Sequence, residues 1–436
     1  MSNIGIIGAG VGGLHLALYL QQHGVSTTLY AERTPAEQRV TRLPNTAGHW
    51  SLTRAREREL GVNHWDEIGE RWGIRDIETL VYVGPEPLRY VAKDVGGIAV
   101  DQRMISAQLI EDFQARGGDV VFGTVKREEL EDLSERHDLV VVSSGRGSLT
   151  ELFPRREKDC PFTQPQRLLC TAIYTGHKMR SPTALTMNEA PGKGELFEVP
   201  YITFDGEQTA LFFEIVPGGP LEPLMQVRYD DDPQAFERTV LDALEEAFPN
   251  TRERIDESSF GVTAPHNVLQ GAITPTARHG LGQLDNGRWV LALGDVHVVQ
   301  DPIMGQGVNA ASHCAFKLGE AIVDDPLAFD ELWCRRIEGR MWDWYEQCYR
   351  WNNYMLQLPM PLNVVKLLIA GSQDPRISEA RFLDLGLPER NWNLVASDTR
   401  TDAFLRGLGY DTDAILPPGM GAPTDASPVM AGTDER

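Results

Sequence analysis

The chain has 436 residues, enough for two domains, and carries a formal net charge of −22 at pH 7. This charge opposes binding to nucleic acid and to anionic membranes, so neither is expected as a partner. No stretch approaches ~18 uninterrupted apolar residues and no basic leader precedes an apolar core, which predicts neither a membrane span nor a secretory signal. The five cysteines lack a C-x-x-C pattern, which indicates a cytoplasmic protein, and no residue cluster has the spacing of a metal site.

The N-terminal segment has the pattern of a dinucleotide-binding β-α-β unit. The apolar run Asn3–Ile7 predicts a strand, a G-x-G-x-x-G turn follows it, and a helix ending near Gly24 leads to a second strand over 27–30. An acid lies about 20 residues past the last glycine, where a ribose 2′-OH is bound. The alternative is a glycine-rich turn that binds nothing. The expected cofactor-binding residues are Gly8, Gly10, Val11, Gly12, Gly13, Glu32 and Arg33.

The remaining elements alternate in kind along the chain. Residues 39–100 are rich in turns, and a helix is predicted over 104–115, followed by strands over 119–122 and 139–142 that both look fully buried. Residues 160–285 change character: a helix over 233–247 interrupts several alternating runs, which predict an antiparallel sheet. These runs are 168–174, 184–187, 194–199, 210–215 and 221–229.

A second glycine-rich segment lies far from the first. The strand over 289–293 enters a corner at Gly294 and Asp295, and Gly305-Gln306-Gly307 opens the first of three helices expected near 308–323, 327–357 and 361–371. Glycines allow close approach to a ligand, and a helix start offers unpaired N–H groups to negative charge. An acid for a sugar hydroxyl, together with donors for a polarised ring, suits a flavin and distinguishes FAD from NAD.

The chain resembles a known family over nearly its whole length. The shared segments are 4–18, Arg42-Leu43-Pro44-Asn45-Thr46, 100–103, 229–233, 269–271, 294–309 and 388–392. The family is the oxygenase component of the two-component styrene and indole monooxygenases. The resemblance implies an α/β fold of the flavoprotein hydroxylase type: a doubly wound, Rossmann-like FAD-binding domain with an inserted antiparallel substrate domain and C-terminal helices.

We therefore expect a discontinuous FAD-binding domain at 1–155 and 286–325. The substrate domain is expected at 156–285 and a helical region at 326–415. The segment 416–436 is rich in Pro, Gly, Ala, Asp and Thr and is predicted to be a disordered tail.

One departure from related hydroxylases concerns the reductant. Single-component flavin hydroxylases usually have Asp-Gly where this chain has Ser144-Gly145, and that Asp helps to bind pyridine nucleotide. The two-component family shares the departure, which implies that reduced FAD comes from a separate flavin reductase. The alternative is neutral drift in a loop. A single-component NAD(P)H-dependent aromatic hydroxylase, an oxygenase for another small apolar substrate and a non-catalytic flavin-binding module also remain open.

The expected reaction uses O2 and a flavin C4a-peroxide to epoxidise an aryl alkene or indole, which demands a water-free site. The helix start Gly305-Gln306-Gly307 can supply hydrogen-bond donors, and Pro302, Ile303 and Met304 can form a dry wall. Asn45 is the side-chain candidate at the reacting face, and the alternative is an ordinary turn residue beside a proline.

The resemblance also implies further site residues. For FAD these are Arg42, Leu43, Arg103, Gly145, Asp295, Pro302 and Asn309, and for the small aromatic substrate Leu43, Pro44, Asn45, His49, Phe213, Pro302, Ile303 and Met304. His49 is equally consistent with a satisfied core histidine. The aromatic residues between 342 and 354 are expected to be core or interface. A homodimer is one possible assembly.

Overall fold

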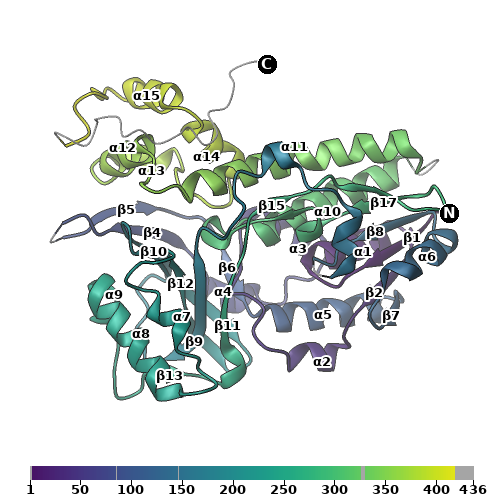
Figure 1. Cartoon of the computed structure of the whole chain (residues 1–436), viewed down its shortest axis with the longest axis horizontal. Coiled ribbons are helices and arrows are strands. Elements are labelled where there is room, and N and C mark those ends of the chain that lie inside the picture. Colours follow the sequence, from purple (N-terminus) through teal and green to yellow (C-terminus); the bar gives the residue numbers. More distant parts are fainter. Residues whose placement is uncertain (1, 85, 146, 326–328, 418–436) are drawn as a thin grey trace. The chain divides into compact units, whose positions relative to one another are not determined.

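The computed structural model describes residues 2–84, 86–145, 147–325 and 329–417 (Figure 1). The chain divides into two compact units. The first comprises residues 1–66, 100–163 and 274–349, and the second comprises 67–99, 164–273 and 350–436. The predicted tail lies outside the described residues from 418 onward. Among the described residues, no helix is both long enough and apolar enough to cross a membrane.

The first unit is built on a six-stranded sheet with the order β16-β17-β8-β1-β2-β7. All neighbours are parallel except β16 and β17. The chain runs outward from β1 to β2 and β7 and then returns to place β8 on the other side of β1, so strands from three separate segments lie side by side, as in a doubly wound fold. The strands are β1 (Asn3–Ile7), β2 (Ser26–Ala31), β7 (Asp119–Phe122), β8 (Leu139–Val142), β16 (Leu281–Gln283) and β17 (Trp289–Ala292).

Helices cover this sheet, and the unit also contains short strands that are not part of it. Helix α6 packs on a core that includes Ile7, Val140 and Val290, while α1 packs against both α5 and α10. The helices are α1 (Val11–Gln22), α2 (Pro35–Arg39), α3 (Ser51–Glu59), α5 (Gln102–Ala115), α6 (Leu130–Arg136) and α10 (Gly307–Asp324). The short strands are β3 (Gly48–His49), β15 (Thr276–Ala277) and β18 (Val298–Val299).

One predicted feature of this sheet is wrong. The run Asp119–Phe122 does form a strand, β7, but it is not buried: the side chains of Val121 and Phe122 are 49% and 39% exposed. Strand β7 is the edge strand of the sheet, paired on one side only with β2. By contrast β8, predicted from a similar apolar run, lies between β17 and β1 and is fully buried.

The second unit contains a larger sheet whose main path is β13-β9-β12-β11-β10-β4-β5. It is antiparallel as predicted, except that β10 pairs in parallel with β4. The strands are β4 (Asp76–Val81), β5 (Leu88–Ala92), β9 (Leu168–Thr175), β10 (Ala184–Ala190), β11 (Gly194–Thr203), β12 (Gly206–Ile215), β13 (Gly261–Val262) and β14 (Val268–Ala272), which pairs with β9.

Helices of the second unit include the predicted 233–247 helix, which is α8 (Pro233–Ala247) and buries its apolar stripe in a core with Leu196 and Leu211. The run 221–229, predicted as a strand, is instead a turn and a short helix, α7 (Pro223–Gln226), because a proline begins it. The other helices are α9 (Pro249–Arg252), α12 (Leu362–Gly371), α13 (Pro375–Glu379), α14 (Pro388–Val395) and α15 (Asp398–Gly407).

Three elements connect the units along the chain: α4 (Asp66–Trp72), β6 (Ile98–Val100) and α11 (Glu331–Met355). Several segments differ from the expected division, among them 274–285, which belongs to the first unit and not to the second. Residues 67–99 supply β4 and β5 to the second sheet, and α11 belongs to the first unit as far as residue 349. Three of the aromatic residues of α11 pack as core, since Tyr345, Tyr349 and Trp351 are each at most 1% exposed, whereas Trp342, Trp344 and Tyr354 are partly buried.

Candidate active site

The candidate site is built at the carboxyl ends of β1, β2, β8 and β17, all within the first unit. At the end of β1, Gly8 has a φ of 115°, a value that favours glycine. A Cβ on Gly13 would lie 2.1 Å from the carbonyl oxygen of Gly8, so only glycine permits this turn. A Cβ on Gly10, in contrast, would meet no atom within 4 Å. The open space over Gly10 is where a pyrophosphate can approach the backbone.

Two helix N-termini face outward from this end of the sheet without a side-chain cap. Helix α1 begins after Gly10 and α10 begins after Gln306, and in neither case does a side chain accept the cap hydrogen bond. Neither helix has an acidic residue in its first turn. Their N–H groups and positive dipole ends can therefore receive negative charge from a ligand.

Acidic side chains accompany both glycine-rich turns. Glu32 follows β2 and pairs with Arg33 at 3.0 Å, but its side chain is still 59% exposed. Asp295, after β17, is exposed as well, and a Cβ on Gly145 would lie 2.6 Å from the Cβ of Asp295. The ends of β8 and β17 are thus held so closely that Gly145 has structural reasons to be glycine. Both carboxylates are available to sugar hydroxyls.

The turn before α10 is fixed by a residue that the sequence did not indicate. Gly305 is left-handed, with a φ of 56°, and its carbonyl oxygen accepts a hydrogen bond from Trp50 Nε1 at 3.0 Å. Gln306 is 1% exposed, and its side-chain amide donates to the Met304 carbonyl at 2.6 Å. A Cβ on Gly307 would meet nothing within 4 Å. Open space therefore lies over the backbone at Gly307, beside the buried side chains of Ile303 and Met304.

The side chain of Asn309 has a structural role. Its Oδ1 accepts from the Trp50 amide at 2.9 Å and from Thr53 Oγ1 at 2.7 Å, and its Nδ2 donates to the carbonyls of Gly48 at 2.8 Å and Gly305 at 2.9 Å. These four bonds use the whole amide, so the predicted direct contact with FAD through this side chain is corrected. Asn309 ties β3 and α3 to the start of α10.

Arg103 is also a positioning residue, and its expected contact with FAD is corrected. The guanidinium is 1% exposed, binds Asp101 with Nη2 at 2.5 Å, and donates from Nη1 to the Thr41 carbonyl at 3.0 Å. It therefore anchors the segment that continues into Arg42, Leu43, Pro44 and Asn45. Within that segment Leu43 is buried, whereas Arg42 and Asn45 are exposed. Asn45 Oδ1 accepts from the Ala47 amide at 3.1 Å.

His49 lies in a buried polar cluster and not on an open surface. It is 1% exposed; its Nδ1 lies 2.6 Å from Glu57 Oε1, and Gln102 donates to its Nε2 at 3.0 Å. Both ring nitrogens therefore have partners within the protein. His49 is a satisfied core histidine, which corrects its expected contact with the substrate. Burial opposes ionisation of Glu57, yet the charges of His49 and His15 hold its pKa below the ordinary value.

The second unit contributes one predicted substrate residue, Phe213. Its side chain is fully buried in the core cluster that packs under α8, together with Phe236 and Leu244. Neighbouring residues of a strand face opposite sides of a sheet, so Phe212 and not Phe213 faces away from α8. The substrate role of Phe213 is therefore corrected to that of a core residue.

The two glycine-rich turns and the exposed acids leave room for FAD, whereas Leu43, predicted to contact it, is buried. The cradle over Gly10, the open backbone at Gly307, two uncapped helix starts and the exposed Glu32 and Asp295 provide phosphate, ring and sugar contacts at one end of one sheet. Sequence reasoning missed Trp50 and also Tyr345, whose buried hydroxyl accepts from the Gly294 amide at 2.9 Å. Both come from segments far from the turns they hold.

Known proteins that are similar in sequence cover most of the chain. A family model described as "Styrene monooxygenase A putative substrate binding domain" matches residues 145–254. Styrene monooxygenase StyA from Pseudomonas fluorescens is 38% identical over 402 residues, which cover 91% of this chain and 96% of that protein. Its counterpart from Pseudomonas sp is 37% identical with the same coverage.

Solved structures share the fold at low sequence identity. The flavin-dependent brominase Bmp2 has a TM-score of 0.63 and 14% identity, over 94% of this chain and 98% of its own. The p-nitrophenol 4-monooxygenase PnpA from Pseudomonas putida DLL-E4 has a TM-score of 0.61 and 13% identity, over 90% of this chain and 98% of its own. These likenesses confirm the predicted fold class.

Proposed function

The chain belongs to the styrene monooxygenase family, and from this premise we propose that it is the oxygenase component of a two-component FAD-dependent monooxygenase. It takes FADH2 from a separate flavin reductase and uses O2 to epoxidise a styrene-like aryl alkene or indole. The observation that carries the proposal is the open backbone at Gly307, where an uncapped helix start meets a wall of buried apolar side chains.

When bound, the reduced flavin supplies the activation of O2. The residues of this chain bind and orient it. The first turn of α10, with Gly305, Gln306 and Gly307, directs N–H groups and a positive dipole end at negative charge on the flavin ring. Glu32 and Asp295 bind ribose and ribityl hydroxyls, and the turn from Gly8 to Gly13 receives the pyrophosphate.

Water exclusion is the second task of the site. The residues that precede the first turn of α10 are apolar: Pro302 is partly exposed, while Ile303 and Met304 are buried, at 3% and 1% exposure. No described acid lies in the first turn of α10, so none is placed there to donate a proton. Oxygen transfer to a π bond requires no proton abstraction, so this apolar segment is consistent with the proposed chemistry.

The proposal of a separate reductase rests on the residues that follow β8. Ser144-Gly145 stands where single-component hydroxylases carry Asp-Gly, and the close contact of Gly145 with Asp295 leaves no room for a larger residue at position 145. Because position 144 is serine, this chain lacks the carboxylate that helps to bind pyridine nucleotide in those hydroxylases. The oxygenase is then expected to depend on a diffusible or handed-over reduced flavin.

The experiment that tests the function supplies purified protein with chemically reduced FAD and O2, and screens styrene, indole and thioanisole for oxygenated products. Product in this reaction, and none with NADH or NADPH and oxidised FAD, is expected. Product formation driven by a pyridine nucleotide without a reductase would select the single-component hydroxylase. Absence of product from all three substrates with reduced FAD would contradict the proposed oxygenase.

Asn45 is proposed to position the substrate or the reacting oxygen. It is exposed at the end of the segment that Arg103 anchors, and an amide can donate a hydrogen bond without being a strong acid. Asn45→Ala should preserve FAD binding but lower the productive step by ~10²-fold, because a misplaced alkene reacts slowly. Epoxide and hydrogen peroxide are measured in the same reaction. Wild-type coupling in the variant would remove Asn45 from the site.

A further inference from the structure

The second unit contains a pocket of about 390 Å³ beside β4 and the loop that precedes β10. Four basic side chains line it, Arg89, Lys178, Arg180 and Arg254, against two acidic ones, Asp76 and Glu78. In a chain whose net charge is −22, this is a local excess of positive charge. An aryl alkene or indole carries no charge, so the pocket does not match the proposed substrate.

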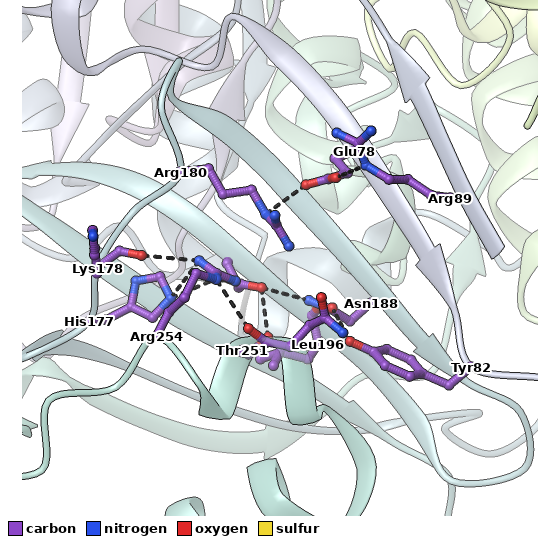
Figure 2. A network of polar contacts seen from close by, with 12 residues as sticks. Glu78, Tyr82, Arg89, His177, Lys178, Arg180, Asn188, Leu196, Thr251 and Arg254 are labelled. Atoms are coloured by element: carbon purple, nitrogen blue, oxygen red, sulfur yellow. Dashed lines mark hydrogen bonds and ion pairs between the residues drawn. The ribbon is translucent and has the colours of Figure 1, made fainter. Parts of the chain in front are cut away.

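The arginines are arranged around one buried carboxylate. Figure 2 shows Glu78 between Arg180 and Arg89, and each guanidinium forms an ion pair with a different carboxylate oxygen. The Arg180 Nε to Glu78 Oε2 distance is 2.6 Å, and Glu78 is 3% exposed. One carboxylate therefore balances two cations, and the side chain of Arg180 remains 26% exposed to the pocket.

The charge of Arg254, in contrast, is already compensated. It pairs with Glu198, which is fully buried and also accepts from Thr251 Oγ1 at 2.7 Å and Asn188 Nδ2 at 2.9 Å (Figure 2). Burial opposes ionisation of Glu198, but the hydrogen bond from His177 and the charge of Arg254 hold its pKa far below the ordinary value. Arg254 is thus a fixed part of the wall.

This fixed wall holds the loop that carries Lys178 and Arg180. The Lys178 amide donates to the Arg254 carbonyl at 2.9 Å, and Arg254 Nη1 donates back to the Lys178 carbonyl at 3.1 Å. At the other end of the loop, Thr183 Oγ1 donates to the Gly73 carbonyl at 2.7 Å. The loop is therefore preorganised before any ligand binds, which lowers the entropic cost of binding.

Two donors point to the kind of ligand. In the described part of the chain, the Lys178 ammonium forms no ion pair or hydrogen bond, and Glu78 is the only ion-pair partner of Arg180. A guanidinium fork and a nearby ammonium match a carboxylate, while Val91, Met179 and Pro182 supply apolar wall. The volume lies at the small end of the range for ligand sites, roughly 300–1,000 Å³, and suits a small molecule.

We propose that this pocket binds a small organic carboxylate, with Arg180 and Lys178 as its recognition residues. The ligand is separate from FAD and from the substrate of the monooxygenase. Because binding is an equilibrium measurement on the full chain without flavin, failure of this inference is distinguishable from failure of the proposed function.

The test is calorimetric titration of the full-length protein with benzoate, and in parallel with its neutral analogue benzamide and with inorganic phosphate. We expect saturable binding of benzoate and no saturable binding of benzamide or phosphate. Arg180→Gln and Lys178→Gln should each weaken it on the order of tenfold, because each removes a charge-assisted hydrogen bond. Arg75→Gln is the matched control, since Arg75 is an exposed arginine of the same unit, 66% exposed, that does not line the pocket.

Lys178 is exposed, so its variant tests the site even if Arg180→Gln is unstable. No saturable benzoate binding at millimolar concentration would overturn the proposal. Equal affinity for benzamide would show that charge is not recognised, and equal affinity for phosphate would show that the apolar wall is not used. Either result, or unchanged affinity in both variants, contradicts a carboxylate site.

Discussion

The two units of this protein contain polar sites of opposite construction. In the first unit, the proposed flavin site is made mainly of backbone: glycines at 10 and 307 leave open space, and two helix starts offer N–H groups. In the second, the pocket is made of charged side chains supported by the buried Glu198. A backbone site depends on the positions where glycine leaves the backbone without a side chain. A side-chain site depends on partners from distant segments, and its stability depends on the pairing of buried charges.

The comparison predicts the largest effect for Glu198. Glu198→Ala leaves Arg254 without its buried counter-ion, which should lower the free energy of unfolding by about 3–5 kcal/mol. Glu207→Ala is the control, because Glu207 also pairs with an arginine, Arg71, but both side chains are about a third or more exposed. This loss should be within about 1 kcal/mol. Urea unfolding followed by circular dichroism measures both, and equal losses would refute the distinction.

A pair of glycine variants tests the backbone site. Gly13→Ala places a Cβ 2.1 Å from the Gly8 carbonyl oxygen, so the turn must shift. We expect the free energy of unfolding to fall by about 1–3 kcal/mol, and the affinity for FAD to fall with it. Gly10→Ala meets no protein atom and Gly10 has a φ of −77°, so its stability should be that of the wild type. FAD affinity should still fall, because the methyl group occupies the space of the pyrophosphate.

Thermal unfolding and anaerobic titration with reduced FAD measure the two variants together. The informative result is the separation of stability from affinity in Gly10→Ala. If Gly10→Ala bound FAD as the wild type does, the pyrophosphate would not lie over this residue. If Gly13→Ala were as stable as the wild type, the turn would be less constrained than its geometry indicates.

The same difference explains what could be predicted from the sequence. The β1–α1 turn and the 294–307 segment were recognisable because their spacing along the chain carries the signal. Three of the four partners of Asn309 lie more than 250 residues away, so its motif position suggested a ligand contact when its amide is in fact used within the protein. Likewise, the partners of Glu198 come from three separate stretches, at 177, 188 and 251–254, and no local pattern marks them.

Burial was predictable only where position in the sheet agreed with composition. The runs at 119–122 and 139–142 each contain at least three consecutive apolar residues, yet β7 is an edge strand and β8 is central. Strand order is a property of the whole chain, and it decides which apolar strand becomes buried.

A buried ionisable cluster of the first unit, around His15, gives a pH-dependent test of that unit. His15 is fully buried next to Glu57, and burial lowers its pKa to about 4, although Glu57 opposes the shift. The unfolded state, with the ordinary value of 6.5, binds the proton first as the pH falls. Protonation of His15 therefore favours the unfolded state below pH 6.5, and the free energy of unfolding should fall by about 2 kcal/mol between pH 6.5 and 5.

His15→Gln isolates this contribution. The stability difference between wild type and variant should shrink by that amount over the same interval, because glutamine does not titrate. Urea unfolding at pH 7, 6.5, 6 and 5 measures it, at low protein concentration since the pI is about 4.9. A difference that stays constant with pH would mean that His15 accepts a proton as readily in the folded protein as in the unfolded one.

The smallest effect is expected where a side chain supplements the backbone site. Glu32 is 59% exposed and can bind the ribose with a charge-assisted hydrogen bond, so Glu32→Ala should weaken FAD binding about tenfold, or about 1.4 kcal/mol. The loss is modest because the glycine turn and the α1 N-terminus still hold the pyrophosphate. Glu128→Ala removes an exposed acid of the same unit outside the site and controls for net charge. Anaerobic titration with reduced FAD measures all three proteins. Equal affinity of the Glu32 variant and the control would show that Glu32 does not contact the ribose. A loss larger than that of Gly10→Ala would reverse the comparison, because the side chain would then contribute more to binding than the open backbone.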